Sequence, residues 1–170
     1  MEFLLKFNDS VAVYEVINDN KAIDDMAISF SGYRGVFYYD LIKEKNIKKQ
    51  GKYLIEKDFK DFNWTLTDEV SIIDSLVCYK AISAIKIKRK RSEIFKPVTA
   101  WYTTEICVSI GPDGFSGLPG LIVELQIDRV ITRLRKIDFT ENDLNIELPN
   151  KGKRMTEKEF EIYIEDLIKD

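Results

Sequence analysis

The feature that most constrains this chain is a succession of short segments in which β-branched and aromatic residues dominate. Such residues are enriched in β-strands, and several segments alternate apolar and polar side chains, as expected of a sheet with one buried face. The segments predicted to be strands are residues 11–16, 36–39, 53–55, 64–67, 76–88, 98–102, 121–127 and 130–137. Parallel neighbours need crossover connections of about a dozen residues or more, and most connections here are shorter. The sequence therefore predicts a mainly β fold with a single curved antiparallel sheet.

Three stretches between these segments are interpreted separately. Residues 18–25 are polar and predict a loop, and residues 26–30 predict the start of a further strand. Residues 43–52 are rich in lysine and are interpreted as a polar connection between two strands.

The C-terminal segment predicts an amphipathic helix. Thr156 and Glu159 have the spacing of a capping box, and Met155 is placed to contact Phe160 across the first turn. Apolar residues then recur at the spacing of one helical face. These residues are Phe160, Tyr163, Ile164, Leu167 and Ile168. Because the opposite face carries charges of both signs, we expect this helix to pack on the sheet rather than lie on a membrane.

Composition limits the chemistry of the chain. It has 170 residues without repeats or low-complexity linkers, which predicts one domain over residues 1–170. It has no histidine, which removes Ser-His-Asp and Cys-His nucleophile systems and histidine-ligated zinc. Its two cysteines cannot supply a four-thiolate metal site. We therefore expect no enzymatic activity, no metal and no cofactor.

The balance of charge limits the partners. The net charge of −3 is too small to draw the whole molecule to nucleic acid, so no nucleic-acid partner is expected. The basic run at residues 86–91 is interpreted as a solvated turn that protects a strand edge rather than as an anion-binding surface. No apolar run approaches the roughly 20 residues of a membrane-spanning helix, so no transmembrane segment is expected.

Residues 111–120 form the most unusual stretch, because they contain half of the eight glycines and half of the four prolines. We call this stretch the glycine–proline segment. It lacks the phosphate-binding P-loop pattern, and a strand rather than a helix is predicted to follow it. The favoured interpretation is a sharp connection that places Phe115 and Leu118 in the core; the alternative is a ligand-binding loop. For that alternative, the candidate binding residues are Trp101, Tyr102, Phe115, Gly117, Leu118, Pro119 and Gly120.

Residues 117–122 read Gly-Leu-Pro-Gly-Leu-Ile, and with this motif the chain resembles the GLPGLI family. The Ala-Trp-Tyr-Thr run at residues 100–103, the Cys-Tyr-Lys-Ala run at 78–81 and the approach to the final helix at 151–156 are also similar to the family. The resemblance covers most of the chain. Cys107 departs from it, because a proline would be expected at that position.

This resemblance implies a compartment rather than a reaction. Members of the family are secreted or envelope-associated proteins of Bacteroidetes-type bacteria and have no assigned function, so no catalytic residues carry over. The first seven residues lack the basic and apolar regions of a signal peptide, so either the protein is cytoplasmic or its signal has been removed. The resemblance implies the second alternative, a periplasmic, envelope or secreted protein. By analogy of fold alone, a curved sheet with one helix is similar to the LolA-like half-barrel of lipoprotein carriers.

The cysteines allow two interpretations. In an oxidising compartment Cys78 and Cys107 could form a disulfide between neighbouring strands. Otherwise both are free thiols that behave as small apolar side chains.

Three functional hypotheses follow, led by a non-enzymatic envelope protein that binds a lipid or other apolar ligand, or an outer-envelope protein. A ligand carrier predicts an apolar cavity. An interaction module, including a homodimer, predicts a filled core and an exposed apolar patch or sheet edge. A carboxylate-dependent hydrolase is the remote alternative and predicts two close carboxylates among Glu105, Asp113 and Glu124.

Overall fold

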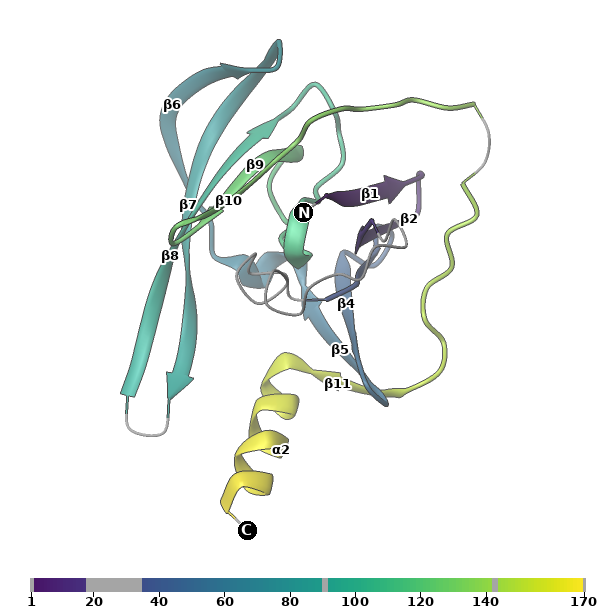
Figure 1. Cartoon of the computed structure of the whole chain (residues 1–170), viewed down its shortest axis with the longest axis vertical. Coiled ribbons are helices and arrows are strands. Elements are labelled where there is room, and N and C mark those ends of the chain that lie inside the picture. The colour runs from purple at the N-terminus through teal and green to yellow at the C-terminus, as the bar shows by residue number, and fades with distance from the viewer. Residues whose placement is uncertain (1, 18–34, 90–91, 142–143, 170) are drawn as a thin grey trace. The chain divides into compact units, whose positions relative to one another are not determined.

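The computed structural model describes residues 2–17, 35–89, 92–141 and 144–169, and the chain divides into two compact units (Figure 1). Unit 1 comprises Met1–Asp61 and Asn142–Asp170, and unit 2 comprises Phe62–Glu141. The expectation of one domain over residues 1–170 stays a prediction. Residues 18–25 and 26–30, predicted as a loop and a strand, lie wholly outside the described residues.

Unit 1 contains a six-stranded sheet in the order β1-β2-β3-β4-β5-β11. The strands are β1 (Phe3–Phe7), β2 (Val11–Val16), β3 (Phe37–Asp40), β4 (Lys45–Gln50), β5 (Tyr53–Asp58) and β11 (Lys153–Thr156). Neighbours from β1 to β5 pair antiparallel, whereas β11 returns from the end of the chain and pairs parallel with β5. The sheet is therefore completed by a strand that lies far away in sequence.

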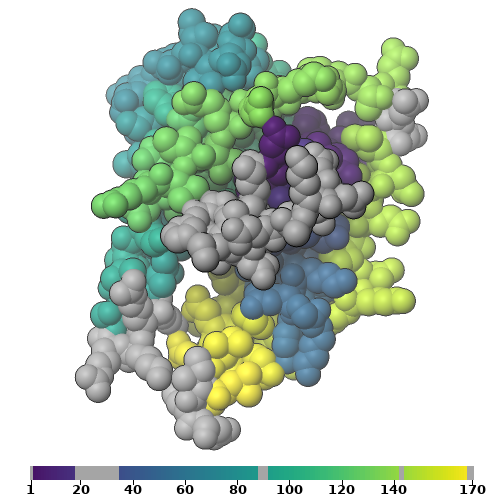
Figure 2. Space-filling model, viewed as in Figure 1, coloured from purple at the N-terminus to yellow at the C-terminus, as the bar shows by residue number. Residues whose placement is uncertain are grey.

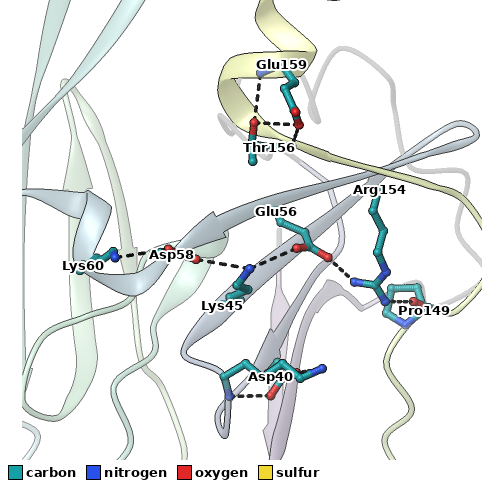
Figure 3. A network of polar contacts seen from close by, with 10 residues as sticks. Asp40, Lys45, Glu56, Asp58, Lys60, Pro149, Arg154, Thr156 and Glu159 are labelled. Atoms are coloured by element: carbon teal, nitrogen blue, oxygen red, sulfur yellow. Dashed lines mark hydrogen bonds and ion pairs between the residues drawn. The ribbon is translucent and has the colours of Figure 1, made fainter.

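The core of unit 1 follows from apolar side chains on these strands. Tyr39 and Leu54 are fully buried, and the Phe3 and Tyr14 rings stack with their centroids 5.3 Å apart. Polar side chains border this core: Lys45 contacts Glu56 across β4 and β5, and Glu56 also pairs with Arg154 of β11 (Figure 3). The Glu56–Arg154 pair links β11 to the sheet.

The helix α2 (Glu157–Lys169) begins as predicted. The Glu159 N–H donates to the Thr156 hydroxyl oxygen at 3.2 Å, and the Thr156 N–H donates to the Glu159 carboxylate at 2.8 Å (Figure 3). Phe160 and Tyr163 pack on Tyr53 of β5, with ring centroids 5.6 and 5.2 Å away. Leu167 is 55% exposed, so only the first turns of the apolar stripe are covered within the described residues.

Unit 2 contains a five-stranded antiparallel sheet in the order β10-β9-β8-β7-β6. The strands are β6 (Thr65–Ile73), β7 (Leu76–Arg89), β8 (Ser92–Thr103), β9 (Leu121–Ile127) and β10 (Val130–Arg133). Asp74 and Ser75 connect β6 to β7 and both have positive φ, as a tight two-residue hairpin turn requires. Neighbouring strands of this sheet follow one another in sequence, and the longest connection, at residues 104–120 between β8 and β9, contains the glycine–proline segment.

The predicted class is confirmed, because the described chain is mostly β with one C-terminal helix. The strands, however, form two sheets rather than one curved sheet, so the half-barrel analogy does not describe their pairing. The 3-10 turn η1 (Phe59–Phe62) separates β5 from β6, and β11 takes the free edge of β5. The pairing of β5 and β11 is parallel, which corrects the expectation of an antiparallel sheet throughout.

Two local predictions are also corrected. The lysine-rich stretch at residues 43–52 contains β4, where Asn46 and Ile47 are buried although most of their neighbours are charged. The last predicted strand, at residues 130–137, ends at Arg133. Among the described residues, no helix has both the length and the apolar character needed to cross a membrane.

Candidate functional site

The glycine–proline segment is an ordered connection between β8 and β9. Pro112–Gly114 forms the 3-10 turn η2, and the Phe115 N–H donates to the Pro112 carbonyl oxygen at 3.0 Å. A β-bridge between Ile110 and Ser116 joins the two arms of the loop. Backbone groups of the segment are thus bonded to one another within unit 2, as buried backbone requires.

Two side chains of the segment enter the core of unit 2. Phe115 and Leu118 are both buried, in a cluster contributed by β7, β8 and β9. The Phe115 ring lies 5.4 Å from that of Phe62 and 5.9 Å from that of Trp64. The Trp64 indole N–H donates to the Ser116 carbonyl oxygen at 2.8 Å. The segment therefore packs as the structural interpretation expects.

Gly120 explains why part of the segment must be glycine. Its φ is +156°, and a Cβ at this position would lie 1.9 Å from the Thr103 carbonyl oxygen. No side chain fits such a close approach of two backbone segments. Gly117 and Pro119, by contrast, are exposed.

Trp101 and Tyr102 complete the set of candidate residues and lie on opposite faces of β8. Tyr102 is buried against Tyr79, with ring centroids 5.9 Å apart, and burial raises the pKa of Tyr102. Trp101 is half-buried, and the Lys80 ammonium group lies 6.0 Å from its ring centroid. The seven candidates thus occupy a core, an opposite face and a solvent-exposed turn, and the structure does not bring them together as one site.

A row of charges on the Trp101 face was not predicted from sequence. Lys80, Trp101, Glu124 and Arg133 lie opposite one another on β7 to β10. Lys80 pairs with Glu69 at 2.8 Å, and Glu124 pairs with Arg133. Each charge in the row has an opposite partner, so the row stabilises the pairing of the strands.

The three carboxylates that flank the glycine–proline segment have separate environments. Glu105 accepts a hydrogen bond from the Val77 N–H at 2.8 Å, and Glu124 is held by Arg133. Asp113 is buried within η2, where its φ is +53°. In the part of the chain that the structure describes, no three Cys, Asp or Glu residues are grouped to hold a metal ion.

Cys78 and Cys107 are free thiols, so the disulfide raised from sequence is not present in the structure. Cys78 is buried, and this desolvation raises its pKa, with the charges of Glu105 and Glu124 acting in the same direction. A raised pKa keeps the thiol protonated and unreactive. Cys107 is exposed, and its Sγ lies 3.5 Å from the Thr104 carbonyl oxygen.

Unit 2 has an exposed apolar surface at the β6–β7 hairpin. Atoms of this part of the chain, coloured blue to teal, are visible in Figure 2. The apolar residues of this surface lie on one face of the sheet, because some are paired with Ala81 and Tyr79 of β7 and the others follow in alternation along the strands. We call this surface the β6–β7 patch, and it consists of Leu66, Val70, Ile72 and Val77. Val70 is 58% and Ile72 74% exposed, although the same face forms the core further along the sheet.

The patch borders an open sheet edge. The strand β6 is the last in its sheet, and within the described residues no further strand pairs with its outer side. An edge strand with exposed apolar side chains offers unpaired backbone groups to another chain. Sequence reasoning did not find this edge, because alternation alone does not tell which strand ends a sheet.

The described residues thus define a β-rich protein of two sheets with an ordered glycine–proline loop at the end of one of them. Residues 64–124, from the start of β6 into β9, match the model of a family described as "Protein of unknown function (Porph_ging)". The chain is similar to this uncharacterised family over that region. No curated protein matches the chain, and no solved structure matches it.

Proposed function

We propose that the protein is a non-enzymatic binding protein of the cell envelope, similar to the GLPGLI family, and that it binds an extended segment of a partner protein at β6. The observation that carries this proposal is the β6–β7 patch beside an open strand edge. Addition of a strand would satisfy the free backbone groups of the edge, and alternate apolar side chains of the partner would cover the patch.

The packing of unit 2 supports a partner at the surface rather than a ligand in its core. Phe115, Leu118 and Tyr102 fill the space beside the sheet, where an apolar ligand would otherwise be enclosed. Exposed apolar side chains that are contiguous on one face are typical of interaction surfaces. A co-purified lipid or other apolar ligand would instead support the carrier hypothesis.

Charge favours a foreign partner over a second copy. The β6 edge and its turn carry Asp68, Glu69 and Asp74, of which only Glu69 is paired with a lysine within the described residues. If two β6 strands paired antiparallel about Ser71, each Asp68 would face Asp74 of the other copy, and like charges opposite one another are destabilising. We therefore expect a partner strand with a basic residue near Asp68.

The compartment belongs to the same proposal. The Gly-Leu-Pro-Gly-Leu-Ile motif at residues 117–122 lies within the region similar to the uncharacterised family. The resemblance to envelope proteins supports a periplasmic or secreted location, where the partner would be an outer-envelope protein. Fractionation of the native organism with an antibody to the chain tests this location.

A synthetic peptide in which Val and Ile alternate with Thr and Lys tests the binding edge. We expect it to bind the full chain in a fluorescence anisotropy titration, and a scrambled peptide of equal composition to bind at least about tenfold more weakly. Val70→Lys should weaken binding by about tenfold or more, because it places a charge in the patch. Ile131→Lys is the matched control, since Ile131 is 54% exposed on β10 at the opposite edge.

Equal binding of both peptides, or equal loss in both variants, would contradict the edge. Native mass spectrometry of the same samples separates the alternatives. A dimer that Val70→Lys dissociates would replace the foreign partner by a second copy, and a bound lipid would replace it by an apolar ligand.

A further inference from the structure

Two basic segments that lie far apart in sequence meet in unit 1. They meet because β11 pairs parallel with β5, which places Lys153 opposite Tyr53. The Lys153 N–H also donates to the Lys52 carbonyl oxygen at 2.8 Å. We call the resulting surface the basic corner, and its lysines are Lys49, Lys52, Lys151 and Lys153.

The charges of the basic corner are not neutralised. Residues 49–54 and 150–155 contain no Asp or Glu, although the whole chain has a net charge of −3. All four lysines are exposed, and none forms an ion pair with a carboxylate in the part of the chain that is described. Several lysines elsewhere are paired, as Lys45 is with Glu56 and Lys6 with Glu15. Repulsion between like charges at close range costs stability unless an anion offsets it.

The acids nearest to the corner already have partners. Glu56 pairs with Arg154 of β11 and with Lys45. The charge of Lys153 acts on Glu159, but the Glu159 carboxylate already accepts hydrogen bonds from the N–H and the hydroxyl of Thr156. Neither carboxylate is therefore available to neutralise the four lysines.

Two phenol groups lie in the same corner. The ring of Tyr163 on α2 lies against that of Tyr53, with centroids 5.2 Å apart and the planes tilted by 53°. The Lys52 ammonium group lies 5.5 Å from the Tyr53 ring centroid. These contacts lower the pKa of Tyr53, with the Tyr163 hydrogen bond as the largest cause and the charges of Lys52 and Lys153 adding to it. Lys52 and Lys153 thus place two positive charges beside the Tyr53 side chain.

We infer that the basic corner binds a phosphate group, carried either by a small solute or by a lipid headgroup. Ammonium groups on flexible stems are suited to a compact polyvalent anion, and phenol hydroxyls donate to its oxygens. Lys153 lies opposite Tyr53 and the Lys52 ammonium group lies beside the Tyr53 ring, so these two lysines can contact one group, with Lys49 and Lys151 adding positive charge nearby in the chain. The site lies on unit 1 and is independent of the binding edge of unit 2, so either can fail alone.

Titration of the full chain with inorganic phosphate tests the solute form, observed by NMR of the backbone amides. We expect saturable shifts confined to residues 49–54, 151–156 and the first turn of α2. Sedimentation with phosphatidylcholine vesicles that contain phosphatidic acid tests the lipid form. Lys52→Gln with Lys153→Gln should weaken the binding of either probe about tenfold, because two charge-assisted contacts are lost. Both side chains are exposed, so folding should be unchanged.

A matched control removes the same number of charges elsewhere. Lys86→Gln with Lys136→Gln changes two exposed lysines of unit 2, and both of these are ion-paired. We expect this variant to bind both probes as the parent does. Shifts with inorganic phosphate support the solute form, and binding to vesicles alone supports the lipid form. Absence of both responses, or equal loss in the two variants, would overturn the inference.

Discussion

The glycine–proline segment of unit 2 and the basic corner of unit 1 differ in how they relate to sequence. The glycine–proline segment is conspicuous in amino-acid composition, yet Phe115 and Leu118 anchor it in the core. Its backbone groups form hydrogen bonds within the same loop. The basic corner consists of two ordinary lysine-containing segments that a parallel strand pairing brings together. A sequence rich in glycine and proline here indicates a tightly packed turn. Exposed lysines that could bind a partner are instead brought together by the pairing of strands far apart in sequence.

If this contrast holds, glycines in the two regions should differ sharply in their tolerance of substitution. Gly120→Ala should destabilise unit 2 by at least about 4 kcal/mol, because its Cβ would meet the Thr103 carbonyl oxygen. Gly51→Ala, beside the basic corner, should cost only about 1 kcal/mol, since its φ is +58° and no atom lies within 4 Å of the added Cβ. Urea denaturation measures both.

Two probes make this comparison clean. Both tryptophans, Trp64 and Trp101, belong to unit 2, so their fluorescence reports the Gly120 variant. Far-UV circular dichroism reports the Gly51 variant, because unit 1 has no tryptophan. Similar losses in the two variants would show that the glycine–proline segment has no special packing requirement.

Side chains of the glycine–proline segment should show the next largest effect. Leu118 is almost fully buried, and Leu118→Ala should cost about 3 kcal/mol through lost burial and a residual cavity. Pro119→Ala is the control, because Pro119 is the next residue in sequence and is exposed. The midpoint of urea denaturation by tryptophan fluorescence measures both. A loss below about 1 kcal/mol for Leu118→Ala would mean that the loop can leave the core, and the ligand-binding interpretation would return.

Strands with strong local patterns were predictable from sequence, and those that depend on distant partners were not. The segment at residues 121–127 coincides with β9, because four apolar side chains alternate along it and the glycine–proline segment precedes it. The strand β4 was missed, since charged residues surround Asn46 and Ile47, and only pairing on both sides makes it a strand. The strand β11 was missed because its partner lies about a hundred residues earlier in the chain.

The candidate sites follow the same rule. The packing of Phe115 was predictable, because an aromatic residue between glycines and prolines is placed by its own turn. The open edge of β6 was not, because edges depend on the order of strands in a sheet. The basic corner was not either, because residues 43–52 were interpreted as a connection and the later lysines as the approach to a helix.

The smallest effect is expected at the start of α2, where the capping box is exposed to solvent. Thr156→Ala removes the hydroxyl that accepts the Glu159 N–H, and should cost about 1 kcal/mol at neutral pH in thermal unfolding followed by circular dichroism. Hydrogen bonds from Thr156 lower the pKa of Glu159, so its contribution is present above the unfolded pKa and is lost as pH falls through the folded pKa. The difference between parent and variant should therefore shrink below about pH 4. Glu159→Gln is the control, since an amide cannot titrate and should remove this part of the pH dependence. A difference that stays constant down to pH 3 would show that the Glu159 carboxylate takes no part in the cap. The exposed polar contacts of unit 1 would then contribute even less to stability, relative to the packing of unit 2, than the structure suggests.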